Sequence, residues 1–395
     1  MKYSALVFTA VAALFIAASP ALADPAHAPV PPSLPLLTVP VRADALIIPV
    51  TIRGRLYHFL LDTGINTLVV DNLLASELTQ REPAEQIPLL YQQILAAGIR
   101  SAGGTLDQQG LQVWRPLAMG IGDAVLPAST PWLGADLSAL TQATGVNIDG
   151  ILGMDVFRQF TWQVDNLKQL LTVWQQTPGE LDYPACVPYR DGDAAGPQLV
   201  LDYHQRPVHM TINTGTDYSY IGAEMINVSR ERPESAVLTG INQPVLGLDG
   251  ESVSDGYLLG GLRFNQIPLG KMLVRENKQG ALGLGMNFLA RFDRYLFMPD
   301  KMQFCYREQH FTRDEPAPLR VLAVRFHARR VELYSNPPAA LHPFGLQNGD
   351  VLLRVNGRPV RPEEIYALRR ALADTPGGQL TLKIERRGKV KTIHI

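Results

Sequence analysis

The sequence predicts a mainly β protein with two similar lobes, followed by a small α+β module. Three observations support this fold class. Short apolar runs broken by Gly, Pro, Asn and Asp fill much of the chain up to residue 306, which is typical of strands and tight turns. A motif at residue 62 returns 151 residues later, at residue 213. Beyond residue 316 the charge density rises, and a segment with helical spacing lies between strand-like segments.

The composition indicates a globular protein with several cores. The chain has 395 residues, 46% of them hydrophobic, which is long enough for two or three domains that each bury a core. Charged residues make up 18% and the formal net charge is −1, so there is neither a basic field nor an acidic tail. We therefore expect no nucleic-acid partner.

The first 23 residues are typical of a signal peptide. Lys2 gives a positive start, residues 5–18 are mostly apolar, and Ala-Leu-Ala precedes Asp24. The alternative is a membrane anchor, but the apolar run is shorter than the roughly 20 residues that a membrane helix needs. The sequence therefore predicts cleavage after residue 23 and export across the inner membrane, to the periplasm of a host with two membranes. We expect no membrane span in the mature chain.

A Pro-rich linker and a first hairpin are predicted next. Residues 24–40 contain repeated prolines and are expected to be an extended linker. The following segment, ALIIPVTIRGRLYHFLLDTG, predicts two strands around a turn at Arg53 and Gly54.

Cys186 and Cys305 permit one disulfide in an exported chain, but two separately buried thiols remain an alternative.

The duplication divides the chain up to residue 306 into two lobes. The motif Asp-Thr-Gly at 62–64 has its counterpart in Asn-Thr-Gly at 213–215, and the preceding Arg and His also recur at the same offset. Each half then closes with a similar segment, DGILGMDVFRQF at 149–160 and GALGLGMNFLARF at 280–292. We therefore predict two β lobes, at residues 41–180 and 190–306.

The carboxylate at the end of the strand FLL requires an explanation. An unpaired buried carboxylate is costly, so Asp62 is expected to face a cleft. Gly64 allows a tight turn with N–H donors, and the hydroxyl of Thr63 can bond to a partner loop. Two such loops meeting head to head would place two acids together, one acting as a base on water and the other polarising a carbonyl.

These residues resemble the retropepsin-like and pepsin-like aspartic peptidases of bacteria, over about residues 41–306. The resemblance rests on FLLDTG, on IDGILGMDVF some 90 residues later, and on the second, degenerate motif. It implies that Asp62 is catalytic and that a mobile flap lies at residues 96–110, with a counterpart at 238–252. It also implies residues that shape the site: Thr63, Gly64, Thr214, Gly215, Ile151, Leu152 and Gly153.

Two departures from the family pattern affect the predicted activity. Asn213 stands where the second catalytic Asp is expected, and an amide cannot relay a proton. Ile65 stands where the family usually has Ala or Ser, which predicts crowding of the cleft. Two function classes remain open: a peptidase that uses Asp62, with Asn213 or as a homodimer of two Asp62 loops, and an inactive pseudopeptidase that binds extended peptide as an adaptor.

Residues 318–395 resemble a PDZ domain of the type found in bacterial type II secretion components. The segment FGLQNGDVLLRVNGRPV carries the landmarks of that family, although its Gly-Asp and Asn-Gly pairs are also ordinary turn signals. The resemblance implies recruitment of a substrate or protein partner, for which addition of an extended strand to a sheet edge is one mode.

No cofactor or metal is expected. None of the eight His residues has a metal-ligand spacing, and the Gly-rich runs lack the Lys-Ser or Lys-Thr of a phosphate-binding loop.

Overall fold

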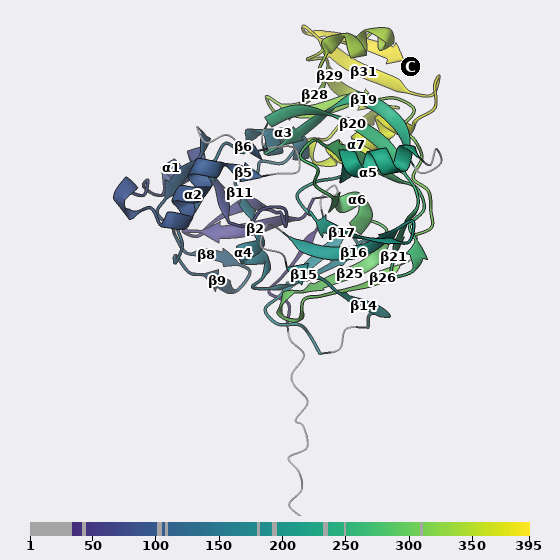
Figure 1. The fold of residues 1–395 in the computed structure, drawn as a ribbon. Helices are drawn as coiled ribbons and strands as arrows, with labels where there is room; N and C mark the ends of the chain where they lie inside the picture. Colours follow the sequence, from purple (N-terminus) through teal and green to yellow (C-terminus); the bar gives the residue numbers. More distant parts are fainter. Residues whose placement is uncertain are drawn as a thin grey trace, which may run out of the picture.

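The computed structural model describes residues 34–41, 45–100, 105–106, 110–179, 182–191, 196–231, 236–248, 250–308 and 311–395. The predicted signal peptide and residues 24–33 of the predicted linker lie outside these ranges. Within them, strands dominate, and Figure 1 shows two β lobes with the C-terminal module above them. The mainly β class is thereby confirmed, and the last module combines strands with a helix.

Each lobe has its own large sheet. In sheet order, the first-lobe sheet contains β7 (Gln112–Trp114), β10 (Trp132–Ala135), β4 (Val69–Asp71), β11 (Gly150–Leu152), β3 (Arg55–Leu61), β2 (Ile47–Ile52), β8 (Met119–Ile121) and β9 (Ala124–Leu126). The second-lobe sheet contains, again in sheet order, β19 (Ala236–Gly247), β20 (Gly250–Leu259), β23 (Met272–Asn277), β18 (Ser219–Gly222), β24 (Gly283–Leu284), β17 (Arg206–Ile212), β16 (Pro197–Tyr203), β21 (Leu262–Phe264) and β22 (Ile267–Pro268), with β15 (Arg190–Asp191) beside β16.

A third sheet joins the lobes, because its strands come from both. In sheet order it contains β1 (Leu37–Pro40), β13 (Leu170–Trp174), β12 (Thr161–Asp165), β25 (Phe292–Met298), β26 (Gln303–Glu308) and β14 (Ala185–Pro188). Residues 37–40 therefore form an edge strand, although the Pro-rich composition predicted linker up to residue 40. Apolar residues alternate with polar ones in this short stretch, and they pack on β13.

The C-terminal module has a separate sheet and its own helix. The sheet contains β27 (Ala323–His327), β28 (Arg330–Tyr334), β29 (Val351–Val355), β31 (Thr381–Arg386) and β32 (Lys389–His394), with β30 (Arg358–Pro359) beside β29. Helix α7 (Ile365–Asp374) buries Ile365, Leu368 and Leu372, as the helical spacing predicts. A buried apolar cluster of this module contains only its own residues.

The remaining helices are short and cover the lobes. They are α1 (Asn72–Leu78), α2 (Leu89–Ala97), α3 (Ser138–Thr144), α4 (Met154–Phe157), α5 (Ala223–Arg230) and α6 (Met286–Leu289), with 3₁₀ turns at Ala84–Gln86, Pro299–Lys301, Pro338–Phe344 and Pro362–Glu364. Among the helices of the described ranges, none has both the length and the apolar character of a membrane span.

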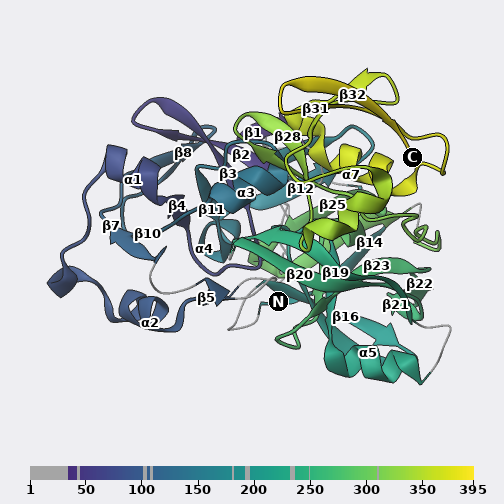
Figure 2. The same cartoon turned by 90° about the horizontal axis from the view of Figure 1, so that it is seen from above.

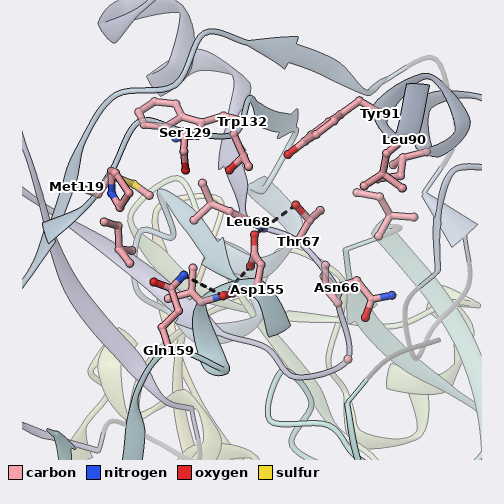
Figure 3. A pocket seen from close by; sticks show the side chains of 18 of the residues that line it. Asn66, Thr67, Leu68, Leu90, Tyr91, Met119, Ser129, Trp132, Asp155 and Gln159 are labelled. Carbon is pink, nitrogen blue, oxygen red and sulfur yellow. Dashed lines mark hydrogen bonds between the residues drawn. The ribbon is translucent and has the colours of Figure 1, made fainter. Parts of the chain in front are cut away.

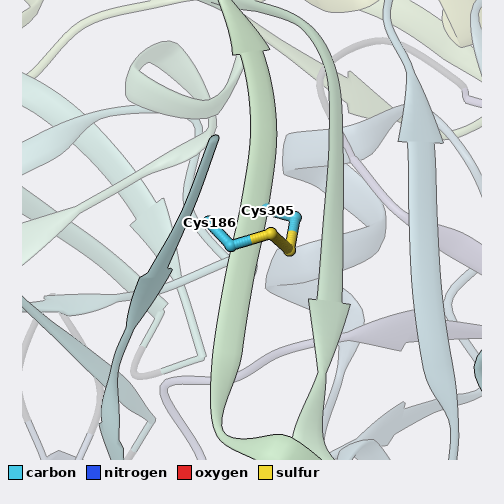
Figure 4. The surroundings of a disulfide bond; sticks show 2 residues. All are labelled: Cys186 and Cys305. Carbon is cyan, nitrogen blue, oxygen red and sulfur yellow. A yellow bond between two sulfur atoms is a disulfide. The ribbon is translucent and has the colours of Figure 1, made fainter. Parts of the chain in front are cut away.

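One buried apolar cluster runs through both lobes and the sheet that joins them. Large side chains at its centre, such as Trp162 of β12 and Phe292 of β25, are almost completely buried. A cross-strand disulfide adds a covalent link in this sheet, since Cys186 of β14 lies opposite Cys305 of β26 (Figure 4). The structure thus resolves the alternative that the sequence left open for the two cysteines.

The predicted hairpin at the start of the first lobe is confirmed. Strands β2 and β3 pair from Ile47 opposite Leu60 to Ile52 opposite Arg55. Arg53 and Gly54 form the turn with φ of 50° and 77°, a combination that suits the twist of the flanking strands. Strand β3 then ends at Leu61, immediately before the Asp-Thr-Gly motif.

Candidate active site

Two equivalent loops leave equivalent strands in the two lobes. Asp62 follows β3, which runs parallel to β11, and Asn213 follows β17, which runs parallel to β24. The N–H of Asp62 donates to the carbonyl of Leu152 at 3.0 Å, and the N–H of Asn213 donates to Leu284 at 2.9 Å. The segment Ile151, Leu152 and Gly153 therefore lies directly behind the Asp62 loop.

The two loops are locked together by their threonines. The N–H of Thr63 donates to Oγ1 of Thr214, and the N–H of Thr214 donates to Oγ1 of Thr63, both at 3.1 Å. Each hydroxyl then donates to a carbonyl of the opposite lobe, Thr63 to Ile212 at 2.6 Å and Thr214 to Leu61 at 2.7 Å. Because all four bonds are buried and cross between the lobes, they fix the position of one loop relative to the other.

The side chains of Asp62 and Asn213 lie against each other's loops. Oδ1 of Asp62 accepts from the N–H of Gly64 at 2.8 Å, and Oδ1 of Asn213 accepts from the N–H of Gly215 at 2.9 Å. A Cβ on Gly215 would lie 2.1 Å from Cγ of Asp62, and a Cβ on Gly64 would lie 2.3 Å from Nδ2 of Asn213. Glycine is required at both positions, because any side chain would displace the opposing polar group.

Burial sets the protonation behaviour of this pair. Asp62 is 9% exposed and Asn213 is 4% exposed. Burial raises the pKa of Asp62 to about 6, although hydrogen bonds from the N–H groups of Gly64 and Gly215 act in the opposite direction. Burial also raises the pKa of Tyr220, whose hydroxyl accepts from Nδ2 of Asn213 at 3.5 Å. The two motifs thus supply one ionisable group, which is a carboxylate above about pH 6, and one neutral amide.

Ile65, the residue that follows the Asp-Thr-Gly motif, is buried. Its side chain is 2% exposed and belongs to a buried apolar cluster of the first lobe, with Leu60, Val69 and Ile151 among its members. We call this the first-lobe cluster. Ile65 also lines the cavity that adjoins the Asp62 loop, described next.

A cavity of about 760 Å³ adjoins the Asp62 loop within the first lobe (Figure 3). One wall is the chain from Gly64 to Leu68, and another is helix α2, which contributes Leu90, Tyr91 and Ile94. In Figure 3 the hydroxyl of Tyr91 points toward Thr67. The cavity therefore offers apolar walls beside the candidate catalytic loop.

Asp155 braces the chain that follows Gly64. Its carboxylate accepts from the N–H of Leu68 at 2.9 Å and from the N–H of Val156 at 2.8 Å, and burial raises its pKa. Asn287 is the corresponding residue of the second lobe, and its Oδ1 accepts from the hydroxyl of Ser219 at 2.8 Å. Neither residue was assigned a role from the sequence. The signal was available, because Gly-Met-Asp and Gly-Met-Asn are the corresponding parts of the two duplicated closing segments.

Both segments expected as flaps contain paired strands. In the first lobe, β5 (Ile99–Arg100) pairs with β6 (Thr105–Leu106), and residues 101–104 and 107–109 of the predicted flap lie outside the described residues. In the second lobe, β19 and β20 form a long antiparallel hairpin that contains the predicted counterpart, except residue 249, which lies outside the described residues. We call residues 236–259 the second-lobe hairpin.

No three His, Cys, Asp or Glu side chains in the described ranges come together as metal ligands.

No protein-family model matches the chain, and no curated protein matches its sequence. Among solved structures, the chain is similar to an aspartic proteinase from Irpex lacteus, with 13% identity, a TM-score of 0.40, and coverage of 70% of this chain and 98% of that chain. It is also similar to basic 7S globulin from soybean, with 13% identity, a TM-score of 0.40, and coverage of 71% and 96%.

Proposed function

We propose that the chain is an exported, aspartic-peptidase-like protein that binds extended polypeptide and hydrolyses it with Asp62. The observation that carries this proposal is the reciprocal bonding of Thr63 and Thr214, which places Asp62 and Asn213 against each other's loops. A buried carboxylate with its pKa raised to about 6, opposite a neutral hydrogen-bond donor, suits general-base chemistry on a water molecule.

The roles of the two side chains follow from their chemistry. Asp62, as a carboxylate, accepts a proton from water while the water oxygen forms a bond to the carbonyl carbon of the peptide. The amide Nδ2 of Asn213 donates to the carbonyl oxygen, where negative charge develops. The C–N bond then breaks, and Asp62 returns its proton to the leaving nitrogen. A second carboxylic acid would perform the polarising step better, so this pair is expected to be slow.

The substrate class follows from the surroundings of the loops. An extended chain can lie between the lobes and exchange main-chain hydrogen bonds with neighbouring strands. The cavity beside Gly64 then receives an apolar side chain, since Leu68, Leu90 and Ile94 line it. Unfolded or extended polypeptide is therefore the proposed substrate.

Export and partner recruitment complete the proposal. A disulfide between Cys186 and Cys305 suits an oxidising compartment such as the periplasm, which agrees with the predicted signal peptide. We assign the C-terminal module a PDZ-like role in recruiting a substrate or partner. The mixed sheet-and-helix architecture of this module and its separate apolar cluster support an independent binding unit.

The alternative function is a pseudopeptidase that binds peptide without cutting it. The fixed amide of Asn213 favours this alternative, because its oxygen accepts from Gly215 and its nitrogen donates to Tyr220. A homodimer of two Asp62 loops would first have to break the four threonine bonds and separate β12 from β25 in the shared sheet. Hydrolysis within one chain is therefore the preferred form.

Hydrolysis of dye-labelled casein, an unfolded polypeptide, tests the proposal. The Asp62→Ala variant is expected to hydrolyse casein at least about 100-fold more slowly than the parent, as is typical when a general base is removed. Asp123→Ala is the matched control, because Asp123 is exposed on the turn between β8 and β9. Equal rates in the parent and Asp62→Ala would exclude Asp62 as the base. Binding without any cleavage by the parent would establish the pseudopeptidase.

A further inference from the structure

The second-lobe hairpin crosses from its own lobe to the other. Strands β19 and β20 pair up to Gly247 opposite Gly250, and Leu248 lies at the tip. Leu248 is 5% exposed and belongs to the first-lobe cluster, together with Ile65 and Ile151. Strand β19 also lies against α3 of the first lobe, and Figure 1 shows this arrangement below the C-terminal module. The hairpin therefore bridges the two lobes, with its tip buried in the first-lobe cluster.

The C-terminal module holds this hairpin through Arg325 of β27. Nη1 of Arg325 lies 3.5 Å from the carboxylate of Glu251, which is the first residue after Gly250 at the hairpin tip. Nε of the same guanidinium donates to Glu332 of the neighbouring strand at 2.8 Å, and the group stacks over the ring of Tyr334 at 5.3 Å. Since Arg325 is positioned by its own module, its ion pair with Glu251 links the hairpin tip to that module.

Arg369 of α7 connects the module to both lobes. Nη2 donates to the carbonyl of Ala143 in the first lobe at 3.0 Å and to the carbonyl of Val324 in β27 at 3.1 Å. Nη1 lies 3.9 Å from the carboxylate of Asp217, four residues after Asn213 in the second lobe. The guanidinium also lies over the ring of Tyr366 at 4.9 Å. One side chain thus links the module, α3 and the loop that carries Asn213.

Helix α3 fills the space beside the outer strand of the module. Strand β27 is at the end of its sheet order, and α3 lies next to it. Helix α3 also lies next to α7, and both helices are labelled in Figure 2. Gly145, which follows α3, packs closely on the 3₁₀ turn before α7, because a Cβ on Gly145 would lie 1.9 Å from the carbonyl oxygen of Pro362. An extended peptide that added to the β27 edge would need the position that α3 now occupies.

We propose that the C-terminal module is an internal latch that holds the tip of the second-lobe hairpin against the first lobe. An extended, acidic peptide that adds to β27 displaces α3. Its carboxylates pair with Arg325 and Arg369 in place of Glu251 and Asp217, and the hairpin is then released. Acidic side chains are specified because both guanidinia already pair with carboxylates of the second lobe, Glu251 and Asp217. Each pair is partly exposed and individually weak, so the latch is reversible. The inference rests on the proposed peptide-binding function of the module.

Hydrogen–deuterium exchange of the full-length protein tests the latch. The double variant Arg325→Gln/Arg369→Gln is expected to raise amide exchange at residues 236–259 by about tenfold or more. Arg330→Gln is the matched control, because Arg330 pairs with Glu385 at 2.8 Å within the module and contacts neither lobe through that pair. A hairpin that exchanges equally in the double variant and the control would overturn the latch.

A second variant distinguishes release of the hairpin from a folding defect of the module. Asp217→Asn/Glu251→Gln removes the same two ion pairs from the second-lobe side and leaves the module unchanged. It is expected to open the hairpin to the same extent, with unchanged exchange in α7. Protection of the hairpin in this variant would contradict the proposal, even if the arginine variant were unfolded.

A peptide of alternating Glu and Val, added to the parent protein, tests the ligand. It is expected to raise exchange in both α3 and the hairpin, whereas a peptide of alternating Lys and Val leaves exchange unchanged. Equal effects of the two peptides would overturn the acidic specificity, and no effect of either would overturn release by a peptide. Exchange does not depend on cleavage, so a protein that never hydrolyses polypeptide can still show the latch.

Discussion

Replacement of Asn213 by Asp is expected to raise the rate of casein hydrolysis by about 10²–10⁴-fold, which is the usual contribution of a positioned general acid or base. The new carboxylate would lie against Gly64 of the opposite loop, as the amide does now. Two buried carboxyls in contact cannot both ionise readily, so they would share one proton. The pH–rate profile should become bell-shaped and acidic, with two apparent pKa values that belong to the pair.

The double variant Asn213→Asp/Asp62→Ala serves as the control and is expected to return the rate to the level of Asp62→Ala alone. A correctly folded Asn213→Asp variant that remains inert would show that the missing carboxyl does not limit the reaction. The next candidates would then be Ile65, which lines the cavity beside the Asp62 loop, and the second-lobe hairpin, whose tip is buried in the first-lobe cluster.

Thr214→Val is expected to lower the free energy of unfolding by about 2–5 kcal/mol and to abolish any Asp62-dependent activity. Valine has nearly the same shape as threonine, so the packing changes little. Without the hydroxyl of residue 214, however, the carbonyl of Leu61 loses its donor and the N–H of Thr63 loses its acceptor. Each buried polar group left without its partner costs about 1–3 kcal/mol. Urea denaturation followed by fluorescence measures the loss.

Thr216→Val is the matched control for this substitution. Thr216 lies two residues further along the same loop, is only partly buried, and makes a long hydrogen bond of 3.4 Å to the carbonyl of Tyr218. Its replacement is expected to change the free energy of unfolding by less than about 1 kcal/mol. If the two variants were equally stable, the interlocked threonines would not be what fixes the two loops.

The sequence predicted the elements that rest on local pattern and on the duplication. The strand, turn and motif around Asp62 are written in consecutive residues, and the equal offsets to Asn213 predicted an equivalent second loop. The segment behind the loop, Ile151 to Gly153, is where the resemblance placed it. Helix α7 followed from apolar residues at helical spacing.

The features that sequence reasoning missed depend on contacts between distant segments. Nothing in the residues around Leu248 indicates that a second-lobe hairpin buries its tip in the first lobe. Arg369 lies on an amphipathic helix, where an arginine is ordinarily a solvated charge, and only the packing of three segments gives it Ala143 and Asp217 as partners. The burial of Ile65 was likewise decided by its neighbours across the first lobe.

The pH dependence of casein hydrolysis by the parent protein tests the central claim most directly. If buried Asp62 is the base and Asn213 a neutral donor, kcat/KM reports the pKa of Asp62 in the free enzyme. Burial raises that pKa to about 6, so kcat/KM should rise with pH through a single ionisation near 6 and then level off. The Asp62→Ala variant should lack this dependence. A parent rate that falls above pH 5, or a profile shared by Asp62→Ala, would contradict the account.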